Sequence, residues 1–106
     1  MSVLERGGNA FDAAVAMGFA LQVVEPHMNG PAGEVPVLFR TAGVDQVHVL
    51  SGIGTAPAKA TPKAFQDLGL DRIPGTGLLP VIVPGAFDAW MKLLRDHGTF
   101  SPHQVM

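Results

Sequence analysis

Residues 7–40 read GGNAFDAAVAMGFALQVVEPHMNGPAGEVPVLFR, and this stretch predicts a helix, a loop and a strand in succession. Asn9 is a favourable N-cap. Asp12, three residues later, completes a capping box and places a carboxylate in the first turn, where the helix dipole favours negative charge. The residue before a proline avoids the helical conformation, so we expect the helix to end before Pro26.

This first helix has an unusually apolar surface. Phe11, Val15 and Phe19 give bulk on one side, while smaller residues recur at three- and four-residue spacing elsewhere: Ala10, Ala13, Ala14, Met17, Gly18 and Leu21. Small side chains let a neighbouring backbone approach closely. We therefore expect the helix to lie between layers of a larger domain.

The loop after the helix, residues 25–34, contains two prolines and two glycines and is longer than an ordinary connection. Long loops of this kind often carry function. Beyond it, Val35–Arg40 and Gln46–Leu50 alternate as strands and predict an antiparallel hairpin with glycine in its turn. Pro36 must then lie at a strand start or on an edge.

Four further helices are predicted. Thr61 and Pro62 form a helix start that leads to about Leu68, and residues 86–97 form an amphipathic helix stopped by Gly98. Its buried face is expected to carry Phe87, Trp90, Met91 and Leu94. Residues 1–6 predict the end of a helix with Val3 and Leu4 facing inward, and residues 80–84 a short extended piece.

The last predicted helix starts at Ser101 and Pro102, four residues before the sequence stops. Both ends of the sequence thus fall inside expected elements. We therefore expect residues 1–106 to be a partial domain of a larger protein.

Composition narrows the possible partners. The chain is 47% hydrophobic and only 15% charged, which indicates an interior-rich segment. Its net charge is −2 with no basic block, so we expect no nucleic-acid partner and no binding to an anionic membrane. The longest apolar run, residues 13–24, is interrupted by Gln22 and is too short for a membrane span. No signal peptide is recognised, and the compartment, cytoplasmic or periplasmic, stays open.

No metal or cofactor site is expected. His27, His48, His97 and His103 lie on different elements without ligand spacing. The run Gly52-Ile-Gly-Thr-Ala-Pro57 begins like a dinucleotide fingerprint but has proline in place of the third glycine.

Two charged residues are candidates for substrate contacts. Glu34 ends the long loop and is able to act in acid–base chemistry, although a solvated loop carboxylate is the ordinary alternative. Arg40 ends a predicted strand, and its planar guanidinium suits bidentate capture of a carboxylate. The alternative for Arg40 is a side chain that is simply paired or stretched along the surface at a strand end.

Three motifs together resemble the gamma-glutamyltranspeptidase family of N-terminal nucleophile hydrolases. They are Gly7-Gly-Asn-Ala-Phe-Asp-Ala-Ala-Val-Ala16, Ala56-Pro-Ala-Lys-Ala-Thr61, and Val83-Pro-Gly-Ala-Phe87 with His97-Gly-Thr99. The resemblance covers nearly the whole chain but only the beginning of a typical family member's large subunit.

The resemblance implies an α/β fold of four layers, αββα, in which this chain supplies helices and an antiparallel hairpin. It implies a precursor that cleaves itself to free a threonine nucleophile. That threonine would lie beyond Met106, so no residue of this chain is expected to be catalytic. The implied partners are the remainder of the large subunit, the small subunit and a small-molecule amide substrate. An arginine after the glycine-rich loop is implied to bind the substrate's α-carboxylate, which points to Arg40, with Glu34 beside the same pocket.

Two departures from the family pattern concern the substrate. The family's glycine run is replaced by Ala32-Gly-Glu-Val-Pro36, and the Arg-Glu that commonly precedes Ala-Pro-Ala is replaced by Ile53-Gly54. The chain is thus more similar to acylase-like or amidohydrolase-like relatives, whose amide substrate need not be glutathione. The resulting hypothesis is amide hydrolysis or acyl transfer, and the alternative is a non-catalytic remnant or small binding module.

Overall fold

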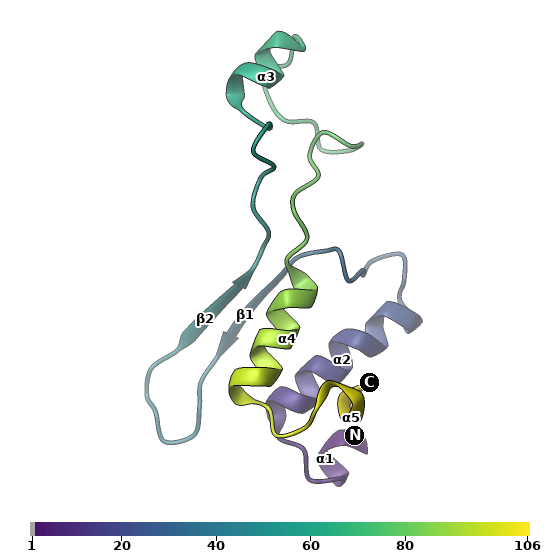
Figure 1. Ribbon diagram of the computed structural model, residues 1–106, viewed down its shortest axis with the longest axis vertical. Coiled ribbons are helices and arrows are strands. Elements are labelled where there is room, and N and C mark those ends of the chain that lie inside the picture. Colours follow the sequence, from purple (N-terminus) through teal and green to yellow (C-terminus); the bar gives the residue numbers. More distant parts are fainter. Residues whose placement is uncertain (1) are drawn as a thin grey trace.

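The computed structural model describes residues 2–106 and arranges them as a helical body from which a narrow arm extends (Figure 1). Two helices, α2 and α4, pack against one face of a two-stranded hairpin. The two short helices α1 and α5 lie together near both termini, and α3 lies at the tip of the arm. The elements are α1 Ser2–Glu5, α2 Ala10–Val24, β1 Val35–Phe39, β2 His48–Gly52, α3 Pro62–Asp67, α4 Ala86–His97 and α5 Pro102–Val105.

Helix α2 has the predicted ends. The Asn9 side chain accepts hydrogen bonds from the N–H groups of Phe11 and Asp12 at 2.9 and 3.0 Å, and the N–H of Asn9 donates to Asp12 Oδ2 at 2.8 Å. The helix ends at Val24, two residues before Pro26. The capping box is therefore confirmed.

Helix α1 ends in a glycine motif, as predicted. Gly7 has φ 91°, the Gly8 N–H donates to the Val3 carbonyl, and the Gly7 N–H donates to the Leu4 carbonyl. These two bonds define a Schellman motif. Val3 is buried, but Leu4 is 46% exposed, so its predicted inward orientation is wrong. Neighbouring helical residues point about 100° apart, and a single turn buries only one side. Met1 lies outside the described residues.

The hairpin is antiparallel, with Val35 opposite Gly52 and Phe39 opposite His48. The second strand begins and ends two residues later than predicted. A shift of two residues leaves each side chain on its original face, so the hydrophobic alternation does not distinguish the two sets of bounds. Val35, Val37 and Phe39 pack on the helices, whereas Pro36 and Leu38 face outward. Arg40 lies just beyond β1.

Helix α4 has the predicted bounds, but its buried face differs in part. Trp90 and Leu94 are buried as predicted, whereas Phe87 is 48% exposed and that prediction is wrong. The reason is that α4 packs against both α2 and β2, and small residues, Ala86 and Ala89, occupy the tightest positions. The core comprises Val15, Ala86, Trp90, Leu93, Leu94 and Val105.

Helix α4 packs closely against α2 because small residues lie on that side of α2. A Cβ added at Gly18 would stand 3.0 Å from Trp90 Cε2, so the indole ring covers this glycine. Met17 and Leu21, on the same side, are 61% and 40% exposed.

The arm contains α3 with its predicted N-cap, Thr61, whose hydroxyl accepts from the Ala64 N–H at 3.2 Å. Residues 80–84 form no strand. They run back beside the segment that leads from β2 to α3 (Figure 1). The Val83 N–H donates to the Thr55 carbonyl at 2.9 Å. In residues 2–106, no helix has the length and hydropathy needed to cross a bilayer.

Candidate functional site

A buried carboxylate joins the first motif to the last. Asp12 is fully buried and accepts hydrogen bonds from the Thr99 hydroxyl at 2.6 Å and from the N–H groups of Thr99 and Phe100 at 3.0 and 3.1 Å. Nearby, the Asn9 amide donates to the His97 carbonyl at 2.7 Å. We call these five residues the Asp12 latch. It fixes the start of α2 to the corner between α4 and α5.

The charge of Asp12 is stabilised in this setting. Burial raises the pKa of Asp12, but the hydrogen bonds from the Thr99 hydroxyl and from the N–H groups of Asn9, Phe100 and Thr99 together lower it by more. The net pKa therefore lies below the usual value of 3.8. The latch therefore consists of an ionised carboxylate and the groups that donate hydrogen bonds to it, and its role is structural.

The third motif and the long loop meet at the base of the arm. The Gly33 carbonyl accepts hydrogen bonds from the N–H groups of Gly85 and Ala86 at 3.3 and 3.1 Å, which ties the long loop to the start of α4. A Cβ at Gly85 would stand 2.5 Å from the Gly52 carbonyl oxygen, and one at Gly54 would overlap the Val83 carbonyl oxygen. We call Gly33, Gly52, Gly54, Val83 and Gly85 the glycine neck. Its chain segments touch backbone to backbone.

The two predicted substrate contacts lie far apart. Glu34 is exposed and follows Gly33 in the neck, whereas Arg40 lies at the turn end of the hairpin. The whole of β1 separates them, which is roughly 20 Å of extended chain. The structure thus places them at two different ends of the hairpin and does not bring them into one cluster.

Arg40 already has a partner. Its Nη1 donates to Asp45 Oδ1 at 3.0 Å across the turn, and both side chains are exposed. A substrate carboxylate would have to replace Asp45. The role of Arg40 as a substrate ligand stays a prediction, and so does that of Glu34.

Sequence reasoning missed an aromatic cluster beneath the turn end of the hairpin. The rings of Phe39 and His97 lie 4.7 Å apart, those of Phe39 and His48 5.3 Å, and those of Phe11 and His97 5.0 Å. Two of the scattered histidines thus converge on one phenylalanine. No group of three or more His, Cys, Asp or Glu that could hold a metal ion occurs in residues 2–106.

An open groove of about 660 Å³ lies between β2, the neck and α4. Its lining includes Leu50, Ser51, Ile53, Thr55, Val83, Asp88, Ala89 and Lys92. Neither its position nor its lining was predicted, because it forms between residues 50–55 and residues 83–92, which are far apart in the sequence.

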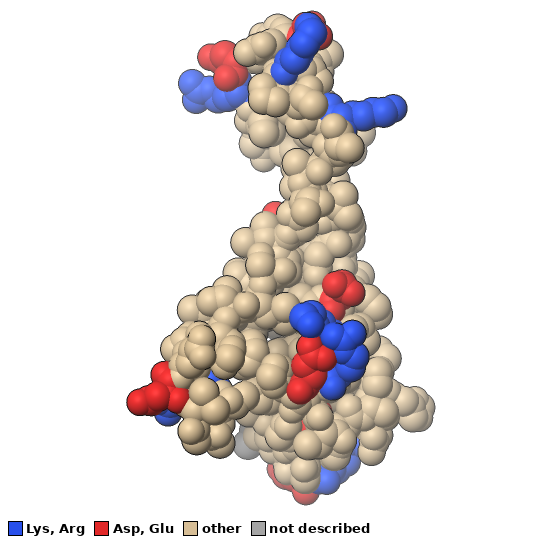
Figure 2. All heavy atoms as spheres, turned by 60° about the vertical axis from the view of Figure 1, so that its left-hand side comes forward, with Lys and Arg blue, Asp and Glu red and all other residues tan. Residues whose placement is uncertain are grey.

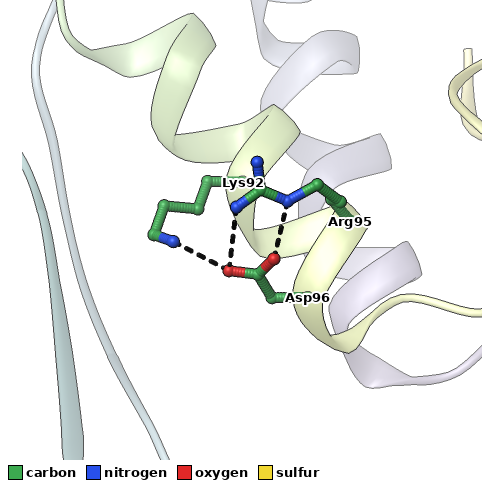
Figure 3. A network of polar contacts seen from close by, with 3 residues as sticks. All are labelled: Lys92, Arg95 and Asp96. Carbon is green, nitrogen blue, oxygen red and sulfur yellow. Dashed lines mark hydrogen bonds and ion pairs between the residues drawn. The ribbon is translucent and has the colours of Figure 1, made fainter.

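Three charged residues of α4 form a polar network (Figure 3), and one of them, Lys92, lines this groove. Asp96 accepts from Lys92 Nζ at 2.8 Å and from Arg95 Nε at 2.7 Å. The hydrogen bond from Arg95, followed by that from Lys92, holds the pKa of Asp96 well below its usual range. The ammonium group of Lys92 is therefore engaged with a neighbouring carboxylate.

Comparison with known proteins finds a matching family and several similar structures. The model of the family described as gamma-glutamyltranspeptidase matches residues 1–106. The structure of LmbA2991HD is 63% identical with a TM-score of 0.94, over 100% of this chain and 18% of that chain. The cephalosporin acylase from Bacillus halodurans is 38% identical with a TM-score of 0.89, over 99% and 19%.

A curated relative, the glutathione hydrolase-like YwrD proenzyme of Bacillus subtilis, is 37% identical over 98% of this chain and 20% of its own length. The chain thus spans about a fifth of the length of the relatives it matches. The helices and antiparallel hairpin match the N-terminal part of N-terminal nucleophile hydrolase structures, which confirms the predicted fold class. The chain belongs to the gamma-glutamyltranspeptidase family.

Proposed function

We propose that the complete gene product is an amide hydrolase or acyltransferase whose nucleophile is a threonine outside residues 1–106. The observation that carries this proposal is the match of the family model to every residue of the chain. The relatives include proteins named as a glutathione hydrolase-like proenzyme and an acylase proenzyme. In this proposal the chain forms the N-terminal part of the large subunit.

Uncovered apolar surface supports the proposal that these residues are a partial domain of an αββα fold. Leu38 and Val49 stand opposite each other on the outer face of the hairpin and are 70% and 68% exposed. At the arm, Leu78 is 89% exposed. Exposed apolar residues grouped in this way favour contact with further polypeptide. We propose that the remainder of the large subunit and the small subunit supply it.

Hydrolysis assays on the complete gene product test the proposed activity. We expect release of p-nitroaniline from at least one acyl p-nitroanilide after self-cleavage. Residues 1–106 expressed alone are the matched control and should release none, because the nucleophile is absent. A folded complete product that hydrolyses no amide in a broad panel would support the non-catalytic alternative.

Arg40 is proposed as a contact for a substrate carboxylate, with Glu34 as a second contact at the other end of β1. Replacing Arg40 by alanine in the complete product should raise KM for carboxylate-bearing amides with little change in kcat. The expected loss of binding is about 1.5–3 kcal/mol, the range for a hydrogen bond to a charged group. Steady-state kinetics across a panel of amides measures it.

The matched control is Asp45→Asn, which removes the present partner of Arg40 and keeps the guanidinium. It should leave KM unchanged or lower it, because the substrate no longer competes with Asp45. Equal KM values for the wild type and Arg40→Ala would remove Arg40 from the binding site.

A further inference from the structure

We propose that residues 81–83 form an edge strand that pairs with an extended segment from the remainder of the same gene product. The pairing site is the open side of this strand, where Ile82 offers its backbone N–H and carbonyl. The inference rests on the part of the proposed function in which further polypeptide of the same protein covers this chain. It does not depend on the amide chemistry.

The residues of this segment favour a strand. Val81, Ile82 and Val83 are all β-branched, and such side chains pack well on a pleated strand. Pro80 and Pro84 bound them, as prolines do at the ends of edge strands. The segment nevertheless forms no strand with any other part of residues 2–106. Its strand preference is therefore left without a partner.

The geometry of the segment leaves one side open. Val81 and Val83 are 55% and 49% exposed, whereas Ile82 between them is half-buried, and this alternation is typical of a strand. The Val83 N–H donates to the Thr55 carbonyl at 2.9 Å, so that residue faces the neighbouring segment of the arm. Successive residues of a strand turn their N–H and carbonyl groups to opposite sides. The backbone groups of Ile82 therefore belong to the other side, and its N–H donates to no backbone carbonyl of residues 2–106.

The open side lacks the charges that commonly keep an edge strand from pairing. No Asp, Glu, Lys or Arg occurs between Arg72 and Asp88. Figure 2 shows the narrow part of the molecule almost without blue or red, with the charged side chains gathered on the arm tip and the helical body. An uncharged, apolar edge suits a permanent contact, because obligate interfaces are more apolar than transient ones.

The lengths of the relatives indicate where the partner strand comes from. The structures of LmbA2991HD and of the cephalosporin acylase match nearly all of this chain, and the arm is included in the match. This chain makes up only about a fifth of each of them. The arm thus keeps its form within much longer chains, which themselves contain the polypeptide needed to cover a permanent apolar edge.

Hydrogen exchange on the complete gene product tests the pairing. The amide of Ile82 should exchange at least about a hundredfold more slowly than in an unstructured peptide, because a paired amide must first open. An Ile82 amide that exchanges at the unstructured rate would overturn the inference.

Two variants of the complete product separate the backbone from the side chain. Ile82→Pro removes the N–H and keeps the extended conformation of the residue before it, whereas Ile82→Val keeps the N–H. Ile82→Pro should lower Tm by about 2 °C or more relative to Ile82→Val. Equal Tm values for the two variants would show that the N–H of Ile82 has no partner.

Photo-crosslinking identifies the partner. p-Benzoylphenylalanine in place of Val81, whose side chain is exposed beside Ile82, should link to residues of the same gene product beyond residue 106. Links between two large subunits on a denaturing gel, links to another protein, or no link at all would overturn the assignment.

Failure of the proposed function looks different. A complete product that hydrolyses no amide but protects the Ile82 amide keeps this inference and loses the proposed activity. An active, self-cleaved product with an unprotected Ile82 amide does the reverse.

Discussion

Replacing Asp12 by alanine should lower the free energy of unfolding by about 3–5 kcal/mol, because four donors lose at once the buried carboxylate that accepts their hydrogen bonds. The donors are the N–H groups of Asn9, Thr99 and Phe100 and the hydroxyl of Thr99. They come from both ends of the chain. The substitution therefore separates the start of α2 from the corner between α4 and α5.

Amide hydrogen exchange measures this effect locally, even within a large protein. The N–H groups of Thr99 and Phe100 should lose protection in both Asp12→Ala and Asp12→Asn, with the larger loss in alanine. Asp96→Asn is the control, since Asp96 lies on the surface of α4 and its ion pairs contribute little to stability. Unchanged protection at Thr99 in Asp12→Ala would show that the latch does not hold this corner.

The pH dependence of the latch has a definite sign. The pKa of Asp12 is lower in the folded protein than its usual value of 3.8. The stabilisation is therefore fully present above the unfolded pKa and is lost as the pH falls through the folded pKa. Wild-type protein should lose protection at Thr99 in this acidic range, whereas Asp12→Asn should show no such dependence there.

Replacing Gly54 by alanine should cost about 3 kcal/mol or more, because the new methyl group overlaps a backbone carbonyl that cannot rotate away. The segment containing Val83 would have to move. The hydrogen bond from the Val83 N–H to the Thr55 carbonyl would then break, and the arm would lose its fixed base.

Gly75→Ala is the matched control on the same arm, since a Cβ at Gly75 meets nothing within 4 Å. We expect it to be neutral or slightly stabilising. Thermal unfolding and hydrogen exchange at Val83 compare the two variants in the complete product. A Gly54→Ala protein as stable as Gly75→Ala would show that the neck is not closely packed.

Local sequence signals predicted most of the elements, because each depends on residues close together in the chain. The capping box at Asn9 and Asp12 and the glycine stop at Gly98 are examples, and both are confirmed. The orientation of α4 was partly wrong at Phe87, because two different neighbours decide which side is buried.

The candidate site was harder to predict because its contacts join residues that are far apart in the sequence. The contact between Asp12 and Thr99 joins residues 87 positions apart, and no spacing rule connects them. The neck requires four glycines from three segments to meet, which the sequence shows only as scattered glycines. Glu34 and Arg40 were predicted from their positions before and at the end of the same strand. The structure shows that this strand separates them.

The central claim is that these residues belong to the N-terminal part of the large subunit of a self-cleaving amide hydrolase. Intact-mass analysis of the complete gene product, combined with N-terminal sequencing, tests it most directly. We predict two polypeptides, of which the second begins with threonine and the first contains this chain. A single uncleaved polypeptide that remains folded would contradict the claim.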